Sequence, residues 1–109
     1  MKTEDIEMTA FQIISNVGTA KSLAMEALYA ARDGNFELAE EKMKESRKFF
    51  VEGHKVHASL IQQEASGNKV GFSMIFMHAE DQLMSAETIS ELVKEMIEMY
   101  KKFGIAVEK

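Results

Sequence analysis

No proline occurs anywhere in this chain of 109 residues, so long helices can run without a break. Only glycine and clusters of turn-forming residues remain to interrupt regular structure. Such clusters occur at two places, Asp33-Gly34-Asn35 and Ser66-Gly67-Asn68. They divide the chain into three long segments, and a helix that filled one of them would be roughly 45 Å long at the standard rise.

The first segment carries a regular apolar stripe. Its apolar residues recur at alternating spacings of four and three, which is typical of a helix packed along a coiled-coil-like seam. Thr3, followed by the acidic residues Glu4 and Asp5, suits the helix start, and Gly34 suits the position just past its end. Most of the stripe is alanine, so we expect neighbouring helices to approach closely. The stripe consists of Ile6, Ala10, Ile13, Val17, Ala20, Ala24, Ala27 and Ala31.

Two further helices are predicted from the other segments. The second begins after Asn35 as its cap and runs from Phe36 to about Ala65, and the third runs from about Phe72 to Phe103, where Gly104 ends it. With short connections, the three helices predict an all-α fold, an antiparallel up-down-up three-helix bundle in a single domain over residues 1–109. Inward positions on the second helix are expected at Ala39, Met43, Phe50 and Ile61.

The predicted third helix is apolar on two of its sides. At about 100° of rotation per residue, the direction of His78 is shared to within roughly 20° by Ile89, Met96 and Phe103. The back of the helix's first half is apolar as well, through Phe72, Phe76, Ala79 and Leu83. Since a bundle of three helices buries one side of each helix, the second apolar surface predicts a homo-oligomer.

A polar cluster lies on the same helix. His78, Asp81 and Gln82 stand at positions i, i+3 and i+4, so their side chains are neighbours on one face. A neutral imidazole is a competent nucleophile near neutral pH, and an adjacent carboxylate or amide can orient its ring or bind a transferred group. The alternative is a polar cluster inside a subunit interface that fixes register, and periodicity alone favours this alternative.

A second pair of histidines occurs in the predicted second helix. His54 and His57 form an H-x-x-H pair that could supply two metal ligands on one face. The sequence fixes no third ligand and contains no cysteine. We therefore expect partly buried histidines near a subunit seam rather than a metal site.

Composition excludes several classes of function. The absence of cysteine excludes a disulfide scaffold, a thiolate zinc site and a cysteine nucleophile within the chain. The net charge of −5, with lysines interleaved among glutamates, argues against a nucleic-acid partner. The first residues lack an apolar signal core, and no stretch approaches the roughly 20 apolar residues that span a bilayer. We expect a cytoplasmic protein without direct membrane insertion.

The run from His78 to Met84, His-Ala-Glu-Asp-Gln-Leu-Met, resembles the His-Ala-Gln-Asp-His-Leu-Met signature of the lactose/cellobiose-type IIA components of the bacterial sugar phosphotransferase system. The likeness extends over nearly the whole chain. Other segments that resemble the family are Phe11-Gln12-Ile13-Ile14, Gly18-Thr19-Ala20-Lys21-Ser22, Glu26-Ala27-Leu28, Ala31-Arg32-Asp33-Gly34-Asn35-Phe36, His54, Leu60-Ile61-Gln62-Gln63-Glu64-Ala65 and Tyr100.

This resemblance implies a phosphotransferase component that acts in a relay. His78 would accept a phosphoryl group from the phosphocarrier protein HPr and pass it to a cysteine of the cognate IIB component during uptake of a β-linked disaccharide. The resemblance also implies a homotrimer, with Asp81 from each subunit around an axial divalent cation such as Mg²⁺. The alternative function is a non-catalytic trimeric helical adaptor in which His78 and Asp81 are polar interface residues.

The sequence departs from the family pattern at three positions. Gln82 stands where the family often has a second histidine, although its amide can still donate a hydrogen bond to a phosphoryl oxygen. Glu80 and His57 each stand where glutamine is usual. Glu80 would add negative charge beside an incoming phosphoryl dianion unless its side chain points away.

Overall fold

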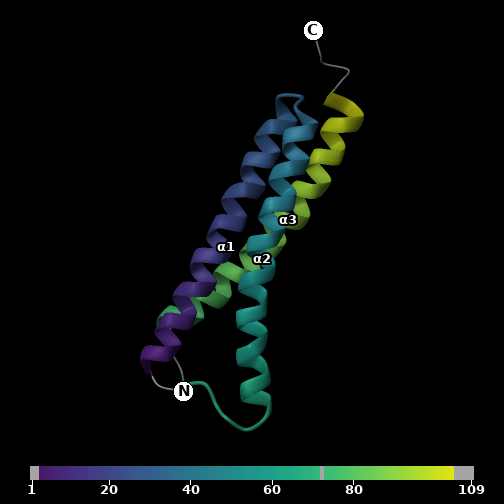
Figure 1. Ribbon diagram of the computed structural model, residues 1–109. Coiled ribbons are helices and arrows are strands. Elements are labelled where there is room, and N and C mark those ends of the chain that lie inside the picture. Colours follow the sequence, from purple (N-terminus) through teal and green to yellow (C-terminus); the bar gives the residue numbers. More distant parts are fainter. Residues whose placement is uncertain (1–2, 72, 105–109) are drawn as a thin grey trace.

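The structure is a computed structural model that describes residues 3–71 and 73–104. It consists of three helices, α1 (Thr3–Arg32), α2 (Phe36–Ala65) and α3 (Met74–Phe103), joined in an up-down-up antiparallel bundle (Figure 1). The bundle is elongated, with extents of 59 × 20 × 19 Å. No strand occurs in the part of the chain that is described, and the predicted all-α three-helix fold is confirmed.

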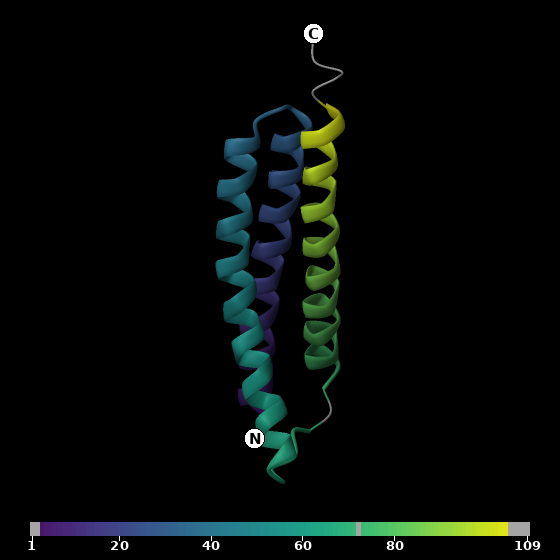
Figure 2. The same cartoon turned by 90° about the vertical axis from the view of Figure 1, so that its right-hand side faces the viewer.

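The first helix forms the centre of the bundle. α1 packs against both α2 and α3, whereas α2 and α3 contact each other far less. Figure 2 shows α1 behind and between the other two helices. Its predicted apolar stripe is confirmed, because every residue from Ile6 to Ala31 in that stripe is buried. The small alanine side chains let both neighbouring helices approach α1 closely.

Small residues also line the α1–α2 contact from the other side. Gly53 of α2 lies so close to α1 that an added Cβ atom would be 2.7 Å from Cγ1 of Val17. Ser46 is buried, and its hydroxyl donates a hydrogen bond of 2.6 Å to the carbonyl oxygen of Ala20. This bond satisfies the one polar side chain found buried among the described residues.

The predicted helix ends agree with the structure except at the start of α3. Gly34 has a φ of 84°, which favours glycine, and Asn35 caps α2 by accepting a hydrogen bond from the Leu38 N–H. The predicted start of α3 near Phe72 is too early. Ser73 is extended and its hydroxyl accepts a hydrogen bond from the Phe76 N–H, so the helix begins at Met74; Phe72 lies outside the described residues. At the other end, Gly104 caps α3 as predicted.

One inward position predicted for α2 is wrong. Ala39 is buried, and Met43 and Phe50 pack partly buried against the core, as expected. Ile61, however, is 52% exposed, and Leu60 is the buried residue at 4%. Continuing the buried positions of α2 by steps of three and four leads to Leu60, and Ile61 is turned from it by about 100°.

The two apolar sides of α3 have different roles in the protomer. The side of Ala79 and Leu83 forms the core, together with Ala86, Val93 and Ile97. The side that carries His78 leaves several large apolar residues exposed in the protomer, and we call these residues the free apolar face. These are Met74, Met77, Met84, Leu92, Met96, Met99 and Phe103.

No described helix is both long and apolar enough to cross a membrane.

Candidate functional site

His78 lies near the start of α3, within the turns that follow the Ser73 cap. Its side chain is exposed, and no hydrogen bond to it is found among the described residues. The next residue, Ala79, is fully buried against the core. The helix is therefore anchored on one side while the imidazole stands free on the other, where another molecule can reach it.

Gln82 lies one turn after His78 and contacts a residue of α1. The Nζ atom of Lys21 donates a hydrogen bond of 2.8 Å to the Oε1 atom of Gln82, and both side chains are half-buried. The sequence alone indicates no chemical role for Lys21. The signal available in the sequence was the position of Lys21 directly after Ala20 of the apolar stripe. A lysine there can lay its stem along apolar surface and extend its ammonium beyond it toward a polar partner.

Asp81 is exposed and lies among the residues of the free apolar face. No hydrogen bond links its carboxylate to His78 or Gln82 within the described chain. About the helix axis, Asp81 and Gln82 lie on opposite sides of His78, about 100° apart. The structure thus brings Gln82 toward α1 and leaves Asp81 facing away from the bundle.

A metal ion would need more than one copy of Asp81. Within the described residues, no group of three or more His, Cys, Asp or Glu side chains is placed to hold a metal. A hard divalent cation takes several oxygen ligands, and one protomer offers a single carboxylate at this position. Asp81 fits such a site only as one member of a set drawn from several chains.

Glu80 and His57 contact each other across the α2–α3 boundary. The Nε2 atom of His57 lies 2.8 Å from the Oε2 atom of Glu80, and the Phe76 ring lies beside the imidazole with ring centroids 6.4 Å apart. About the helix axis Glu80 is turned roughly 200° from His78. Its carboxylate therefore points away from His78, and two of the three departures from the family pattern, Glu80 and His57, are partners.

His54 and His57 have different partners in the structure. His57 is half-buried and bound to Glu80, in agreement with the expected partly buried histidine. His54 is exposed in the protomer, and its expected place near a subunit seam stays a prediction. Its ring stacks on Phe50, with centroids 6.1 Å apart and an angle of 17° between the planes.

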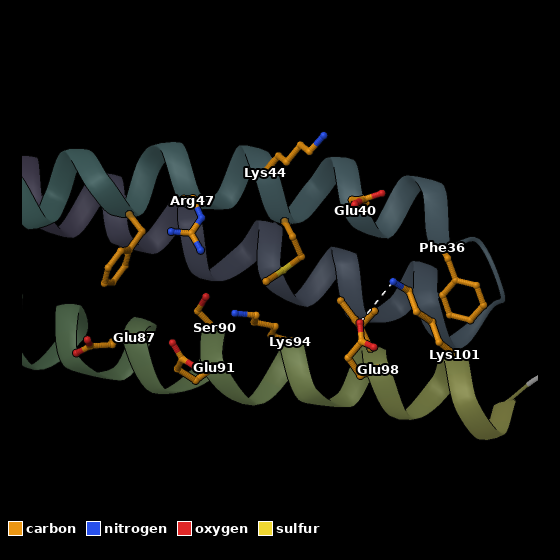
Figure 3. A pocket seen from close by; sticks show the side chains of 13 residues that line it. Phe36, Glu40, Lys44, Arg47, Glu87, Ser90, Glu91, Lys94, Glu98 and Lys101 are labelled. Carbon is orange, nitrogen blue, oxygen red and sulfur yellow. Dashed lines mark hydrogen bonds and ion pairs between the residues drawn. The ribbon is translucent and has the colours of Figure 1, made fainter.

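A groove lies elsewhere, between α2 and α3. It has a volume of about 320 Å³, and none of His78, Asp81 and Gln82 lines it. Its floor is partly apolar, and its rims carry charges of both signs. Figure 3 shows Arg47 pointing from α2 toward α3, and Glu98 of α3 paired with Lys101 at 3.5 Å. This groove is therefore separate from the three residues of the histidine site.

The fold and the site define a class of protein. It is an all-α bundle that presents one unpartnered imidazole on the outer surface of a long helix, suited to meeting another macromolecule. The chain belongs to the lactose/cellobiose-specific IIA subunits of the phosphotransferase system, whose family model matches residues 8–101. The components of this family are phosphotransfer relay proteins.

Individual relatives agree with this assignment. The chain is 38% identical over 99 residues to the lichenan-specific phosphotransferase enzyme IIA component of Bacillus subtilis, covering 91% of this chain and 90% of that protein. The crystal structure of the cellobiose-specific enzyme IIA from Bacillus anthracis matches with a TM-score of 0.89 and 40% identity, covering 100% of this chain and 96% of that one. A solution structure of the Escherichia coli IIA(Chitobiose)–HPr complex matches with a TM-score of 0.79 and 35% identity, covering 91% and 96%.

Proposed function

We propose that this chain is a phosphocarrier in which His78 accepts a phosphoryl group from HPr and passes it to a cysteine of a IIB component. One observation carries the proposal: the imidazole of His78 is exposed and unpartnered on an anchored helix of a IIA-family fold. The E. coli relative in complex with HPr supports HPr as the donor. The absence of cysteine from this chain fits a relay in which the thiol belongs to the partner.

The chemistry requires little from the protein beyond positioning. A ring nitrogen of His78 attacks the phosphorus as the bond from phosphorus to the donor's histidine breaks. In the second step the IIB thiolate attacks the same phosphorus and the imidazole of His78 leaves. Because the transition state is loose, in-line placement and charge stabilisation are the main demands. Gln82, one turn away, can donate its amide N–H to a phosphoryl oxygen.

The proposed transport substrate is a β-linked disaccharide. The names of matched relatives refer to lactose, lichenan, cellobiose and chitobiose. In such a system the sugar is bound by the membrane component, so the IIA chain needs no sugar pocket. The exposed surface around His78 accords with a protein partner, and the proposed relay operates in the cytoplasm.

We also propose that the working form is a homotrimer. The free apolar face contains seven large apolar side chains that the protomer leaves exposed, and soluble monomers rarely retain a continuous surface of this kind. Asp81 lies among them. In a trimer built on this face, His78 has to open onto a groove between subunits, because a sealed histidine could not react. Three copies of Asp81 could hold an axial Mg²⁺ or another divalent cation, which would offset the repulsion between the carboxylates.

The rival function is a non-catalytic trimeric adaptor with His78 and Asp81 as polar interface residues. Intact mass spectrometry after incubation with phosphoenolpyruvate, HPr and the enzyme that phosphorylates HPr separates the two. The phosphocarrier gains one phosphoryl group, which is labile in acid and stable in base. The adaptor gains none.

Substitution of the histidines identifies the acceptor. His78→Ala should abolish phosphoryl acceptance and leave helicity unchanged, because its side chain is exposed in the protomer and alanine has a high helix propensity. His54→Ala and His57→Ala should retain most acceptance and serve as matched controls. Acid-labile phosphate on the His78→Ala chain would show that another residue is the acceptor.

A further inference from the structure

A single side-chain hydrogen bond joins α1 to α3 in the described chain, and it lies beside the proposed acceptor. It runs from the Lys21 ammonium to the Gln82 amide at 2.8 Å. Gln82 is four residues after His78, so the two side chains are neighbours on α3. Helical side chains lean toward the N-terminus, which places the Gln82 side chain over the turn that carries His78.

The chemistry of lysine determines which way the amide is turned. An ammonium group has three donors and no acceptor, so only the oxygen of the Gln82 amide can face it. The amide nitrogen, with its two donors, must then point away from Lys21. The contact thus fixes Gln82 as a hydrogen-bond donor at its free end, which is the role that a phosphoryl oxygen requires.

The charge of Lys21 is also uncompensated. No carboxylate lies within ion-pair distance of its ammonium among the described residues. Lys42, by contrast, lies 2.9 Å from Glu26, and this hydrogen bond raises the pKa of Lys42. Near His78, the carboxylate of Glu80 is turned to the opposite side of α3 and bound by His57. Lys21 therefore leaves one positive charge on the α1 side of the site.

We propose that Lys21 is a positioning residue for phosphoryl acceptance: its ammonium holds the Gln82 amide with the nitrogen available to the phosphoryl group on His78, and its charge favours the dianion there. This role rests on the proposed function of His78. It predicts that Lys21 affects both the rate of acceptance and the equilibrium share of phosphoryl group that the chain holds against HPr.

The test compares Lys21→Met with Lys21→Arg, and uses Lys42→Met as the matched control. Methionine keeps most of the apolar stem and removes the charge and donors, whereas arginine restores both. Lys42 makes the corresponding α1–α2 contact with Glu26, far along the sequence from the site. We expect Lys21→Met to slow acceptance from HPr by about tenfold, less than the about 10²–10³ that follows outright removal of one preorganised oxyanion-hole donor, because Gln82 itself remains. Lys21→Arg should stay within about threefold of wild type.

Two further readouts separate positioning from a merely structural role. Lys21→Met should shift the phosphoryl equilibrium toward HPr, and Lys42→Met should leave it unchanged, because fold stability does not enter that equilibrium once both chains are folded. Lys21→Met should slow acceptance by a smaller factor in a chain that already carries Gln82→Leu than in the wild-type chain. The reason is that part of the effect of Lys21 passes through the Gln82 amide.

The outcomes distinguish this role from the proposed function. Slow acceptance with a shifted equilibrium in Lys21→Met, and neither in Lys42→Met, supports the role. If the wild type accepts phosphate and Lys21→Met matches it in rate and equilibrium, the role of Lys21 is overturned while the function of His78 stands. If the equilibrium is unchanged and the two methionine variants lose rate equally, Lys21 is structural. A wild-type chain that accepts no phosphate overturns both.

Discussion

At the scale of single residues, His57 determines where the carboxylate of Glu80 lies relative to the proposed phosphoryl acceptor His78. A glutamate two positions from a proposed phosphoryl acceptor would repel a dianion if it shared the acceptor's side of the helix. In the structure its carboxylate lies 2.8 Å from the imidazole of His57 on the other side of α3. This is the one polar side-chain contact found between α2 and α3 in the described chain.

The contact between Glu80 and His57 should contribute measurably to stability. A double-mutant cycle of His57→Ala, Glu80→Ala and the double variant should give a coupling free energy of about 0.5–1.5 kcal/mol, because the pair is half-buried and hydrogen-bonded. Urea denaturation at one fixed protomer concentration measures it. Strictly additive losses would mean that the two side chains do not contact each other in solution.

At the scale of the helices, glycine has opposite effects at two positions. Gly53 permits the close contact of α2 with α1, where Val17 is fully buried and a Cβ atom added at Gly53 would force a shift. Gly18 lies within α1, and a Cβ atom added there would meet nothing within 4 Å in the protomer. Both glycines lie inside helices, where alanine has the higher propensity.

Alanine substitution at these two glycines should therefore change stability in opposite directions. Gly53→Ala should lower the free energy of unfolding by about 1–2 kcal/mol, since overpacking outweighs the gain in helix propensity. Gly18→Ala should raise it by up to about 1 kcal/mol. Thermal or urea unfolding of the two variants beside the wild type gives the sign. A stabilised Gly53→Ala protein would show that α1 and α2 are farther apart than described.

At the scale of the whole molecule, the free apolar face determines the expected assembly. Sedimentation should give a mass near three times that of the 12.3 kDa chain. Leu92→Glu should dissociate the assembly, because it introduces a charge where an apolar side chain is expected to be buried, while the exposed Leu38 on α2 provides a control as Leu38→Glu. A wild-type chain that sediments as a monomer at micromolar concentration would contradict the trimer.

Asp81 tests how that assembly is held together. If three carboxylates gather around a cation, a chelator should loosen the trimer at neutral pH, because the repulsion at close range and intermediate dielectric is several kcal/mol. Asp81→Leu should remove the need for metal and leave phosphoryl acceptance by His78 largely intact. Sedimentation with and without chelator, beside the phosphorylation assay, gives both results.

Other outcomes for Asp81→Leu would assign the carboxylate differently. An intact trimer that cannot be phosphorylated would mean that Asp81 orients the imidazole or takes part in transfer. A variant that falls apart into monomers would mean that the carboxylates attract through hydrogen bonds across the interface, and the cation account would have to be abandoned.

The sequence by itself determined the number of helices, their ends apart from the start of α3, and the inward face of α1. These features depend on the local sequence. They follow from the absence of proline, the caps at Asn35 and Gly104, and the spacing of apolar residues along α1, which does not depend on the neighbouring helices. The motif around His78 was equally readable, because a signature of consecutive residues needs no tertiary contact.

Only the tertiary structure decided which of the two apolar sides of α3 forms the core, and that Leu60 rather than Ile61 faces inward. It also paired Glu80 with His57 and Lys21 with Gln82. A helix repeat fixes the directions of its side chains relative to one another, but the direction of the neighbouring helix is set by packing between residues far apart in sequence. Contacts between residues separated by dozens of positions therefore become visible only when the bundle is assembled.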